Sequence, residues 1–200
     1  MAPSDWQAAN SATLPEDFTK NFTIKVKPDT DIWRPNPTHD VFTAPHIYKT
    51  IAAKNFKSLA ATVTADWKTL YDQGGIFLAF PQARADVPTK WIKAGIEYYQ
   101  GRYALSVVGC DNFSDWSLCP LDDGETSASL EFLWDEKALN VFVHRKGQKQ
   151  ILREILWAFG NLEVGQPVRA GVYGAKPKED EGNATAELEV KFSGLKLEIV

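Results

Sequence analysis

Lys93 and Glu97 lie four residues apart inside an apolar and aromatic run, KWIKAGIEYYQGRYALSVVGCDNFSDWS, which spans residues 90–117. On a helix, this spacing would make them a surface ion pair that contributes little stability. On a strand, both side chains would point to the same face of a sheet, about 13 Å apart at ~3.3 Å per residue. In that case the ammonium and the carboxylate could serve a binding site or act as acid and base.

The turn that follows this run decides between the two interpretations. Residues 100–101, Gln-Gly, separate two β-like runs and are typical of a two-residue hairpin turn. That turn places Glu97 opposite Ala104 and Lys93 opposite Val108. One face of the hairpin is then wholly apolar or aromatic: Ile92, Ala94, Ile96, Tyr98, Tyr103, Leu105 and Val107. A one-residue slip would drive both charges into this core face, so the sequence specifies the register strongly and favours a hairpin.

The opposite face of the predicted hairpin combines charged, aromatic and small side chains. These are Trp91, Lys93, Gly95, Glu97, Tyr99, Arg102 and Ser106. Charged residues are ordinary on a face that meets solvent. Large aromatic residues beside small ones, however, leave space on which a ligand could rest. The residues alone leave both interpretations open.

Similar β-branched and aromatic runs recur along the chain, with turn-forming residues between them. They span residues 22–27, 58–67, 74–80, 90–99, 102–110, 129–134, 139–145, 150–159, 168–175 and 184–200. Short strands with regular turns and no alternating helices predict an antiparallel sandwich or barrel. We expect one domain over residues 21–200, preceded by an N-terminal arm at residues 1–20.

The composition of the 200 residues excludes several classes of protein. Hydrophobic residues make up 44% and the net charge is −4, with Lys and Arg scattered singly. We therefore expect no nucleic-acid partner and no membrane partner. No apolar run approaches the ~18 residues of a membrane span, and the first twenty residues lack a basic and apolar leader. These features predict a cytoplasmic protein.

Cysteine and histidine usage predicts no metal site. Cys110 and Cys119 are too few for a disulfide framework and are expected to be reduced thiols. His39, His46 and His144 lie far apart in the sequence without metal-ligand spacing. No glycine-rich phosphate-binding motif occurs. We expect neither a metal nor a cofactor.

Carboxylate pairs of the kind that retaining glycosidases use are missing from the sequence pattern. Glu131 and Asp135 would lie about 13 Å apart on a strand, whereas such enzymes need about 5 Å. An enzyme that needs only one acid or base remains open. Lys93, Glu97 and His46 would then form its acid/base group.

Six motifs in order make the chain resemble a known family. They are TDIWR at residues 30–34, YDQGGIFLAF at 71–80, WIKAGIEYYQG at 91–101, LSVV at 105–108, SDWS at 114–117 and GVYGAKP at 171–177. Over roughly residues 30–200 the chain resembles the fungal regulation-of-enolase protein family. That family is a group of concanavalin A-like domains of unknown function. Residues 131–160 fit the family's pattern only loosely.

The resemblance implies an all-β, antiparallel two-sheet jelly-roll sandwich with a concave face, which in the wider superfamily often holds sugars or other small molecules. Together with the hairpin it predicts these ligand-binding residues: Trp33, Gln73, Trp91, Lys93, Glu97, Tyr99, Ser106 and Trp116. We expect this face to bind a carbohydrate or another metabolite. The family name implies a regulatory link to carbon metabolism.

Two other functions stay open from the sequence. One is a cofactor-free enzyme, a lyase, isomerase or pericyclic catalyst, that acts on a small and partly apolar metabolite in the same groove. The other is the binding of a protein partner, which would need an exposed apolar patch.

Overall fold

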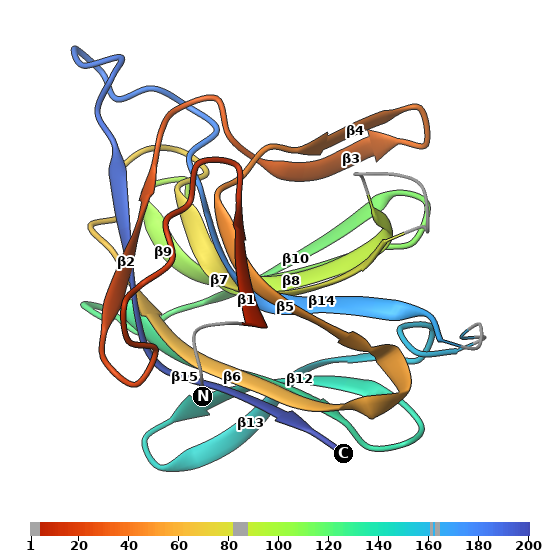
Figure 1. Ribbon diagram of the computed structural model, residues 1–200. Coiled ribbons are helices and arrows are strands. Elements are labelled where there is room, and N and C mark those ends of the chain that lie inside the picture. The colour runs from red at the N-terminus through yellow and green to blue at the C-terminus, as the bar shows by residue number, and fades with distance from the viewer. Residues whose placement is uncertain (1–4, 82–87, 161, 163–164) are drawn as a thin grey trace.

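The computed structural model describes residues 5–81, 88–160, 162 and 165–200. The described strands form two antiparallel sheets and a separate two-stranded hairpin (Figure 1). The chain is therefore an all-β jelly-roll sandwich of the concanavalin A-like kind, as predicted. The elements named in the following paragraphs are all strands. A short 3-10 turn lies at Ala53–Asn55.

The seven-stranded sheet carries the predicted hairpin near one edge. In spatial order it contains β1 (Trp6–Ala9), β5 (His46–Ala52), β14 (Pro167–Ala175), β7 (Gln73–Pro81), β8 (Pro88–Tyr99), β9 (Arg102–Cys110) and β10 (Ser114–Pro120). Strand β14, from late in the chain, lies between β5 and β7, which come from its first half.

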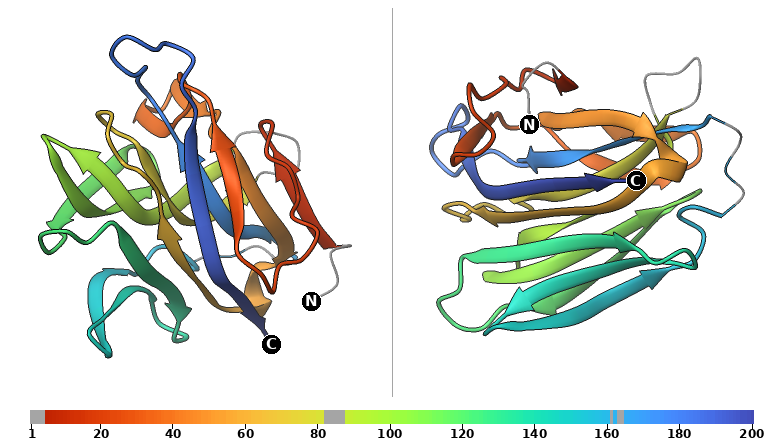
Figure 2. Two further views of the ribbon diagram at one scale, coloured as in Figure 1. Left: turned by 90° about the vertical axis from the view of Figure 1, so that its left-hand side faces the viewer. Right: turned by 60° about the horizontal axis from the view of Figure 1, so that its bottom comes forward.

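The six-stranded sheet packs against the first. In spatial order it contains β13 (Gln148–Ile155), β12 (Leu139–Arg145), β11 (Ser127–Trp134), β6 (Phe56–Thr64), β15 (Leu188–Ile199) and β2 (Phe22–Val26). Strand β15, late in the chain, pairs with both β6 and β2, so strands from the first and last parts of the chain are neighbours in this sheet (Figure 2).

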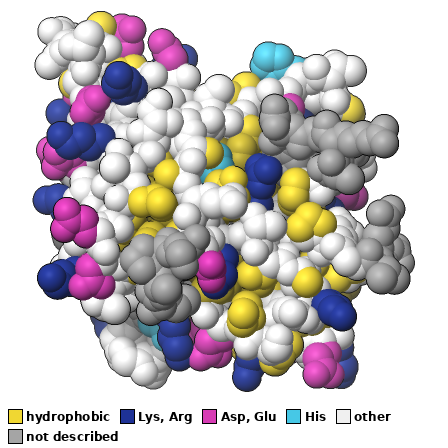
Figure 3. Space-filling view, in the orientation of Figure 1, with side chains coloured by type: hydrophobic (Ala, Val, Ile, Leu, Met, Phe, Trp, Pro, Cys, Tyr) yellow, Lys and Arg dark blue, Asp and Glu magenta, His cyan; other side chains and the backbone are white. Residues whose placement is uncertain are grey.

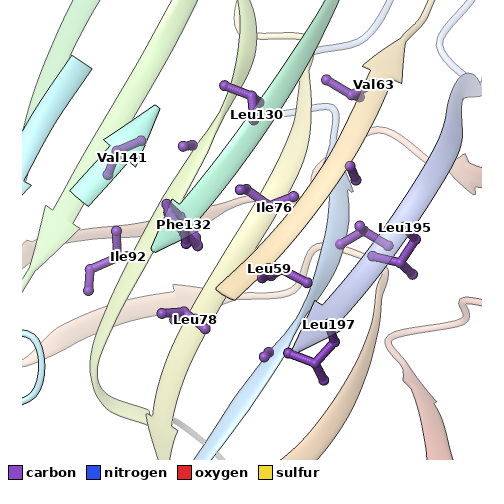
Figure 4. Close-up of a cluster of buried hydrophobic side chains, with 14 of the residues drawn as sticks. Leu59, Val63, Ile76, Leu78, Ile92, Leu130, Phe132, Val141, Leu195 and Leu197 are labelled. Atoms are coloured by element: carbon purple, nitrogen blue, oxygen red, sulfur yellow. The ribbon is translucent and has the colours of Figure 1, made fainter. Parts of the chain in front are cut away.

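The main hydrophobic core fills the space between the sheets, because every second residue of each strand points inward. Figure 4 shows side chains that meet in this core: Ile76, Leu78 and Ile92 from the seven-stranded sheet, and Leu59, Val63, Leu130, Phe132, Val141, Leu195 and Leu197 from the six-stranded sheet. The apolar face of the β8–β9 hairpin, with Ala94, Ile96 and Leu105, belongs to it as predicted.

Two glycines allow the sheets to approach closely at one end. A β-carbon on Gly74 would lie 2.6 Å from Val190 Cγ1. A β-carbon on Gly174 would lie 2.7 Å from methyl groups of both Val190 and Val26. Such distances are far inside van der Waals contact, so only glycine fits these positions without a shift of the neighbouring sheet.

The predicted register of β8 and β9 is confirmed. Glu97 pairs with Ala104 and Lys93 with Val108. Gln100 and Gly101 both have positive φ, 50° and 79°, as a two-residue turn of the mirror-image type I requires.

Other boundaries differ from the expectation. The run at 150–159 leaves its strand at Ile155, and strands β1, β3, β4, β5 and β10 were not predicted. Within the expected arm, residues 1–20, β1 pairs with β5, and Trp6 and Phe18 are buried in the main core. Residues 1–4 lie outside the described residues. In the described part of the chain, no helix is long and apolar enough to cross a membrane.

Candidate ligand site on the concave face

The outer face of the seven-stranded sheet is partly covered by the remaining hairpin, β3 (Ile32–Asn36) and β4 (His39–Phe42). A second hydrophobic cluster lies between this hairpin and the sheet. It contains Ile32, Ala44, Tyr48, Phe77, Ala79, Trp91, Val108, Cys110, Tyr173 and Ala175, with Trp33, Phe42 and Trp116 packed against it. Figure 3 shows hydrophobic side chains at the surface in the middle of this view, next to the hairpin.

Polar contacts hold the β3–β4 hairpin onto the sheet. The Arg34 guanidinium pairs with Asp40 within the hairpin and donates to the carbonyl oxygen of Asp111 at 3.2 Å. The backbone N–H of Arg34 donates to the Ser114 hydroxyl at 2.8 Å. Because Asp111 and Ser114 lie where β9 turns into β10, the hairpin is tied to the edge of the sheet.

A pocket of about 320 Å³ lies beside this hairpin on the concave face. Its lining residues are Asp31, Trp33, Tyr71, Gln73, Lys93, Glu97, Val108, Trp116, Pro177 and Lys178. The volume lies near the lower end of the ~300–1,000 Å³ that ligand pockets usually span. The rings of Trp33 and Trp116 stand nearly perpendicular, with 6.5 Å between their centroids, and form aromatic walls.

Lys93 is only 2% exposed, and its ammonium is used within the protein. It donates to the carbonyl oxygen of Ile32 and to Gln73 Oε1, each at 2.6 Å, and lies 3.7 Å from Asp31 Oδ1. The Gln73 amide nitrogen in turn donates to Asp31 Oδ1 at 3.3 Å. Lys93 and Gln73 therefore position Asp31 and the start of the hairpin rather than offering free hydrogen-bonding groups.

Glu97 is 5% exposed and has a different role in the pocket wall. Its Oε2 accepts hydrogen bonds from the Ser106 hydroxyl at 2.7 Å and from Trp116 Nε1 at 3.2 Å. No described residue donates to its other oxygen, Oε1. Burial raises the pKa of Glu97, and the positive charge of Lys93 and the Ser106 hydrogen bond offset part of this rise. The carboxyl is thus fixed by one oxygen, with the other free for a ligand.

A buried ionic cluster fixes the rim of the pocket. The Lys176 ammonium pairs with Asp72 Oδ1 at 3.2 Å and with Asp180, and all three side chains are nearly or fully buried. Asp72 also accepts from the backbone N–H groups of Lys68 and Thr69. Tyr71 directly precedes Asp72 in the chain, and Pro177 and Lys178 directly follow Lys176. The cluster therefore holds these three lining residues in place.

The structure brings five of the eight predicted ligand residues to the pocket: Trp33, Gln73, Lys93, Glu97 and Trp116. The other three do not line it. Ser106 lies behind Glu97, and Tyr99 packs edge-on against Trp116 with centroids 5.1 Å apart. Trp91 is fully buried beneath the hairpin, where its ring faces Phe42 at 6.5 Å.

His46 also lies outside the pocket, on β5 beneath the hairpin. Its ring is 5.2 Å from that of Phe77, and Nδ1 is 2.9 Å from the carbonyl oxygen of Ala44. Burial lowers the pKa of His46, which favours the neutral imidazole. The structure thus does not bring this histidine together with Lys93 and Glu97 in one acid/base group.

Sequence reasoning missed the other five lining residues: Asp31, Tyr71, Val108, Pro177 and Lys178. Four of these lie within the motifs that carry the family resemblance, and Lys178 follows the last of them directly. Tyr71 has a positive φ of 70°, a conformation that the sequence did not signal.

Comparisons with known proteins agree with this architecture. The family model described as "Protein of unknown function (DUF1349)" matches residues 6–199. An uncharacterized protein of Emericella nidulans is 35% identical over 189 residues, which cover 93% of this chain and 91% of that protein.

Two solved structures share the fold. A functionally unknown protein from Saccharomyces cerevisiae has a TM-score of 0.77 at 21% identity, over 100% of this chain and 99% of that one. A LamA variant from Z. galactanivorans, in complex with laminaritriose and laminaritetraose, has a TM-score of 0.57 at 8% identity, over 98% of this chain and 92% of that one. At these identities the likeness concerns the fold alone.

Proposed function

Because this chain belongs to the DUF1349 family, whose function is unknown, we propose its function from its own concave face: the pocket binds a small carbohydrate or a similar metabolite. The observation that carries the proposal is the Glu97 carboxyl. It is almost fully buried, held by Ser106 and Trp116 through one oxygen, and left without a protein partner at the other. Because Glu97 lines the pocket, a ligand hydroxyl there can form a hydrogen bond with this second oxygen.

The aromatic walls support a ligand with one apolar face. Trp33, Tyr71 and Trp116 line the pocket together with the polar groups. A sugar ring can stack its C–H face on such side chains while its hydroxyls reach carboxylates at the edge. The LamA structure with bound oligosaccharides shares this sandwich fold, which favours carbohydrates among the candidate ligands.

Thermal unfolding with a ligand panel tests the proposal. A ligand that binds only the folded chain raises its stability by about 2.7 kcal/mol at a hundred times Kd. We expect neutral monosaccharides or disaccharides to raise the Tm of the native chain. Trp33→Leu should reduce this shift, whereas Phe113→Leu, at an exposed aromatic residue outside the pocket, should not. The absence of a shift with every sugar and small metabolite would contradict the proposal and favour a protein partner.

A cofactor-free enzyme is the second candidate, and a specific observation favours it. Desolvation raises the pKa of the Glu97 carboxyl above its ordinary value, and this carboxyl lines the pocket, where it could act as an acid. A lyase, isomerase or pericyclic catalyst would use such a group in the same pocket. Mass spectrometry of the ligand after incubation with the protein distinguishes conversion from binding.

The wider role stays a proposal as well. On the resemblance to regulation-of-enolase proteins, we propose that the chain lies in the cytoplasm and regulates carbon metabolism there. Fluorescence microscopy of the tagged chain in fungal cells checks the location. Enolase activity in extracts with and without the chain checks the regulatory role, and equal activity in both would contradict it.

A further inference from the structure

Two carboxyl groups in the pocket each keep one oxygen that no described residue occupies. Glu97 comes from β8 and Asp31 from the residue before β3, and both line the pocket. The Asp31 Oδ1 atom accepts from the Ile32 backbone N–H at 2.7 Å and from Gln73 Nε2 at 3.3 Å, with Lys93 Nζ at 3.7 Å. Its Oδ2 accepts no hydrogen bond from the described residues. The pocket thus presents two free carboxyl oxygens.

The surroundings of these two carboxyls differ in how far each is buried. Glu97 is desolvated, and the negative charge of Asp31 adds to the rise of its pKa. Asp31 is less buried, with 27% of its side chain exposed, and two N–H donors and an ammonium surround one of its oxygens. The pocket therefore pairs a desolvated carboxyl, Glu97, with a more exposed one, Asp31, that is anchored through Oδ1.

We propose that Glu97 and Asp31 act as acid and base in opening the ring of a reducing monosaccharide, so that the pocket interconverts its anomers. This inference rests on the proposed function, binding of a small carbohydrate in the same pocket. The size of the pocket, about 320 Å³, suits a single ring better than a chain of sugars.

The reaction balances without a cofactor or a co-reactant. Glu97 Oε1 gives its proton to the ring oxygen as the bond from the anomeric carbon to that oxygen breaks. Asp31 Oδ2 takes the proton of the anomeric hydroxyl, whose oxygen becomes the aldehyde oxygen. After rotation about the bond next to the aldehyde, both protons return and the ring closes on the opposite face. The sugar leaves as the other anomer, and both carboxyl groups regain their initial protonation.

Other residues position the two groups. Ser106 and Trp116 hold Glu97 by Oε2, which leaves Oε1 for the ring oxygen. Lys93 and Gln73 hold Asp31 by Oδ1, which leaves Oδ2 for the anomeric hydroxyl. Each carboxyl therefore has one oxygen for anchoring and one for proton transfer.

Proton NMR of freshly dissolved α-D-glucose, α-D-galactose and α-D-xylose tests the inference, because the two anomers give separate signals. We expect the native chain to speed the approach to the anomeric equilibrium for at least one sugar. Glu97→Gln and Asp31→Asn should each lower the protein-dependent rate by about 100-fold or more, the usual worth of an acid or base. Glu189→Gln, on the exposed face of β15, is the matched control and should retain the full rate.

The pH dependence supplies a second readout. The protein-dependent rate should fall as the pH rises through the raised pKa of Glu97, because the acid then loses its proton. Thermal unfolding of each variant shows whether it is folded. A sugar-induced Tm shift that survives in Glu97→Gln while the rate is lost assigns the residue to proton transfer.

Methyl α-D-glucoside separates this inference from the proposed function, since it has no free anomeric hydroxyl and cannot open. We expect it to raise the Tm, to stay intact and to inhibit the conversion of glucose. Hydrolysis of the methyl glucoside would overturn the inference in favour of a glycosidase. Sugars that raise the Tm without faster anomer exchange would overturn the inference and leave the binding function standing. If no sugar binds, both the inference and the proposed function are wrong.

Discussion

At the scale of single residues, the pocket places an ionisable group where its charged form is costly. Glu97 is almost fully buried, and the two hydrogen bonds to its Oε2 offset only part of the lost hydration. Carboxyls with raised pKa values that face a pocket are typical of functional sites. The cost of the buried carboxylate should be measurable as a dependence of folding stability on pH.

Glu97→Gln should remove a fall in stability between acidic and neutral pH. Folding raises the pKa of Glu97 above its ordinary value of 4.5, so the folded state binds this proton more tightly than the unfolded state. The resulting stabilisation is complete below pH 4.5 and is lost as the pH rises through the raised pKa. Each tenfold difference in proton affinity corresponds to about 1.4 kcal/mol.

Urea unfolding at pH 4 and pH 7 measures this effect. The native chain should lose more stability between these pH values than Glu97→Gln, whose amide oxygen can still accept from Ser106 and Trp116. Glu189→Gln should behave like the native chain. An identical pH dependence of stability in the native chain and in Glu97→Gln would show that folding does not change the pKa of this carboxyl.

Lys93→Met should destabilise the fold, because it removes a buried ammonium that donates two hydrogen bonds. Methionine keeps the length of the side chain, so the change mainly removes the charge and the donors. The carbonyl oxygen of Ile32 and Gln73 Oε1 would lose their donor in a buried site. Leaving a buried acceptor without its donor costs about 1–3 kcal/mol. Urea unfolding of Lys93→Met beside Lys196→Met, whose side chain is exposed, measures the difference. Equal stability of the two variants would mean that water replaces the lost ammonium.

At the scale of the elements, the close approach of the two sheets depends on glycines near the start of β7 and the end of β14. Gly174→Ala should cost about 1–3 kcal/mol, because the added methyl would overlap side chains of both Val26 and Val190. Gly160→Ala is the control, since its β-carbon would have no neighbour closer than 3.7 Å. Chemical denaturation compares the two. If both variants lose the same amount of stability, the cause is a backbone effect of replacing glycine and not overlap with the valine side chains.

The elements also show what the sequence could predict. The register of β8 and β9 followed from one turn and from alternation, because neighbouring strands pair through local geometry. Strand β3 was missed because its Pro35 and Asn36 match a turn signal, whereas here they form the exposed end of a hairpin strand. Strand β1 is only four residues long, too short for alternation to stand out.

The pocket, too, has one part that could be predicted from the sequence and one part that could not. Its floor comes from β8 and could be predicted, because Lys93 and Glu97 share a face with their neighbours. Asp31, Tyr71 and Lys178 come from the segments that flank β3, β7 and β14. Only the arrangement of strands across the whole sheet brings these segments together, and the order of strands in a sheet leaves no local trace in the sequence.

At the scale of the whole molecule, the two cysteines lie in opposite environments. Cys119 is exposed on β10, whereas Cys110 is buried beneath the β3–β4 hairpin. Burial raises the pKa of the Cys110 thiol to about 11, which leaves almost no reactive thiolate near neutral pH.

A thiol-reactive dye at pH 8 should therefore label one cysteine quickly in the folded chain and two in guanidinium chloride. Cys119→Ser should abolish the fast reaction. Rapid labelling of two thiols in the native chain would show that the β3–β4 hairpin opens readily from the sheet.

The position of β14 and β15 has a consequence for how the chain is made. Each of these strands lies between two strands from earlier in the chain, and together they come from residues 167–199. While the ribosome is still translating, β5 and β7 lack their common neighbour, as do β6 and β2. Both half-built sheets then expose unpaired edges of the kind that aggregate. The nascent chain must therefore stay unfolded, or be held by a chaperone, until residues 167–199 emerge, and a chain truncated before β14 should accumulate as insoluble material.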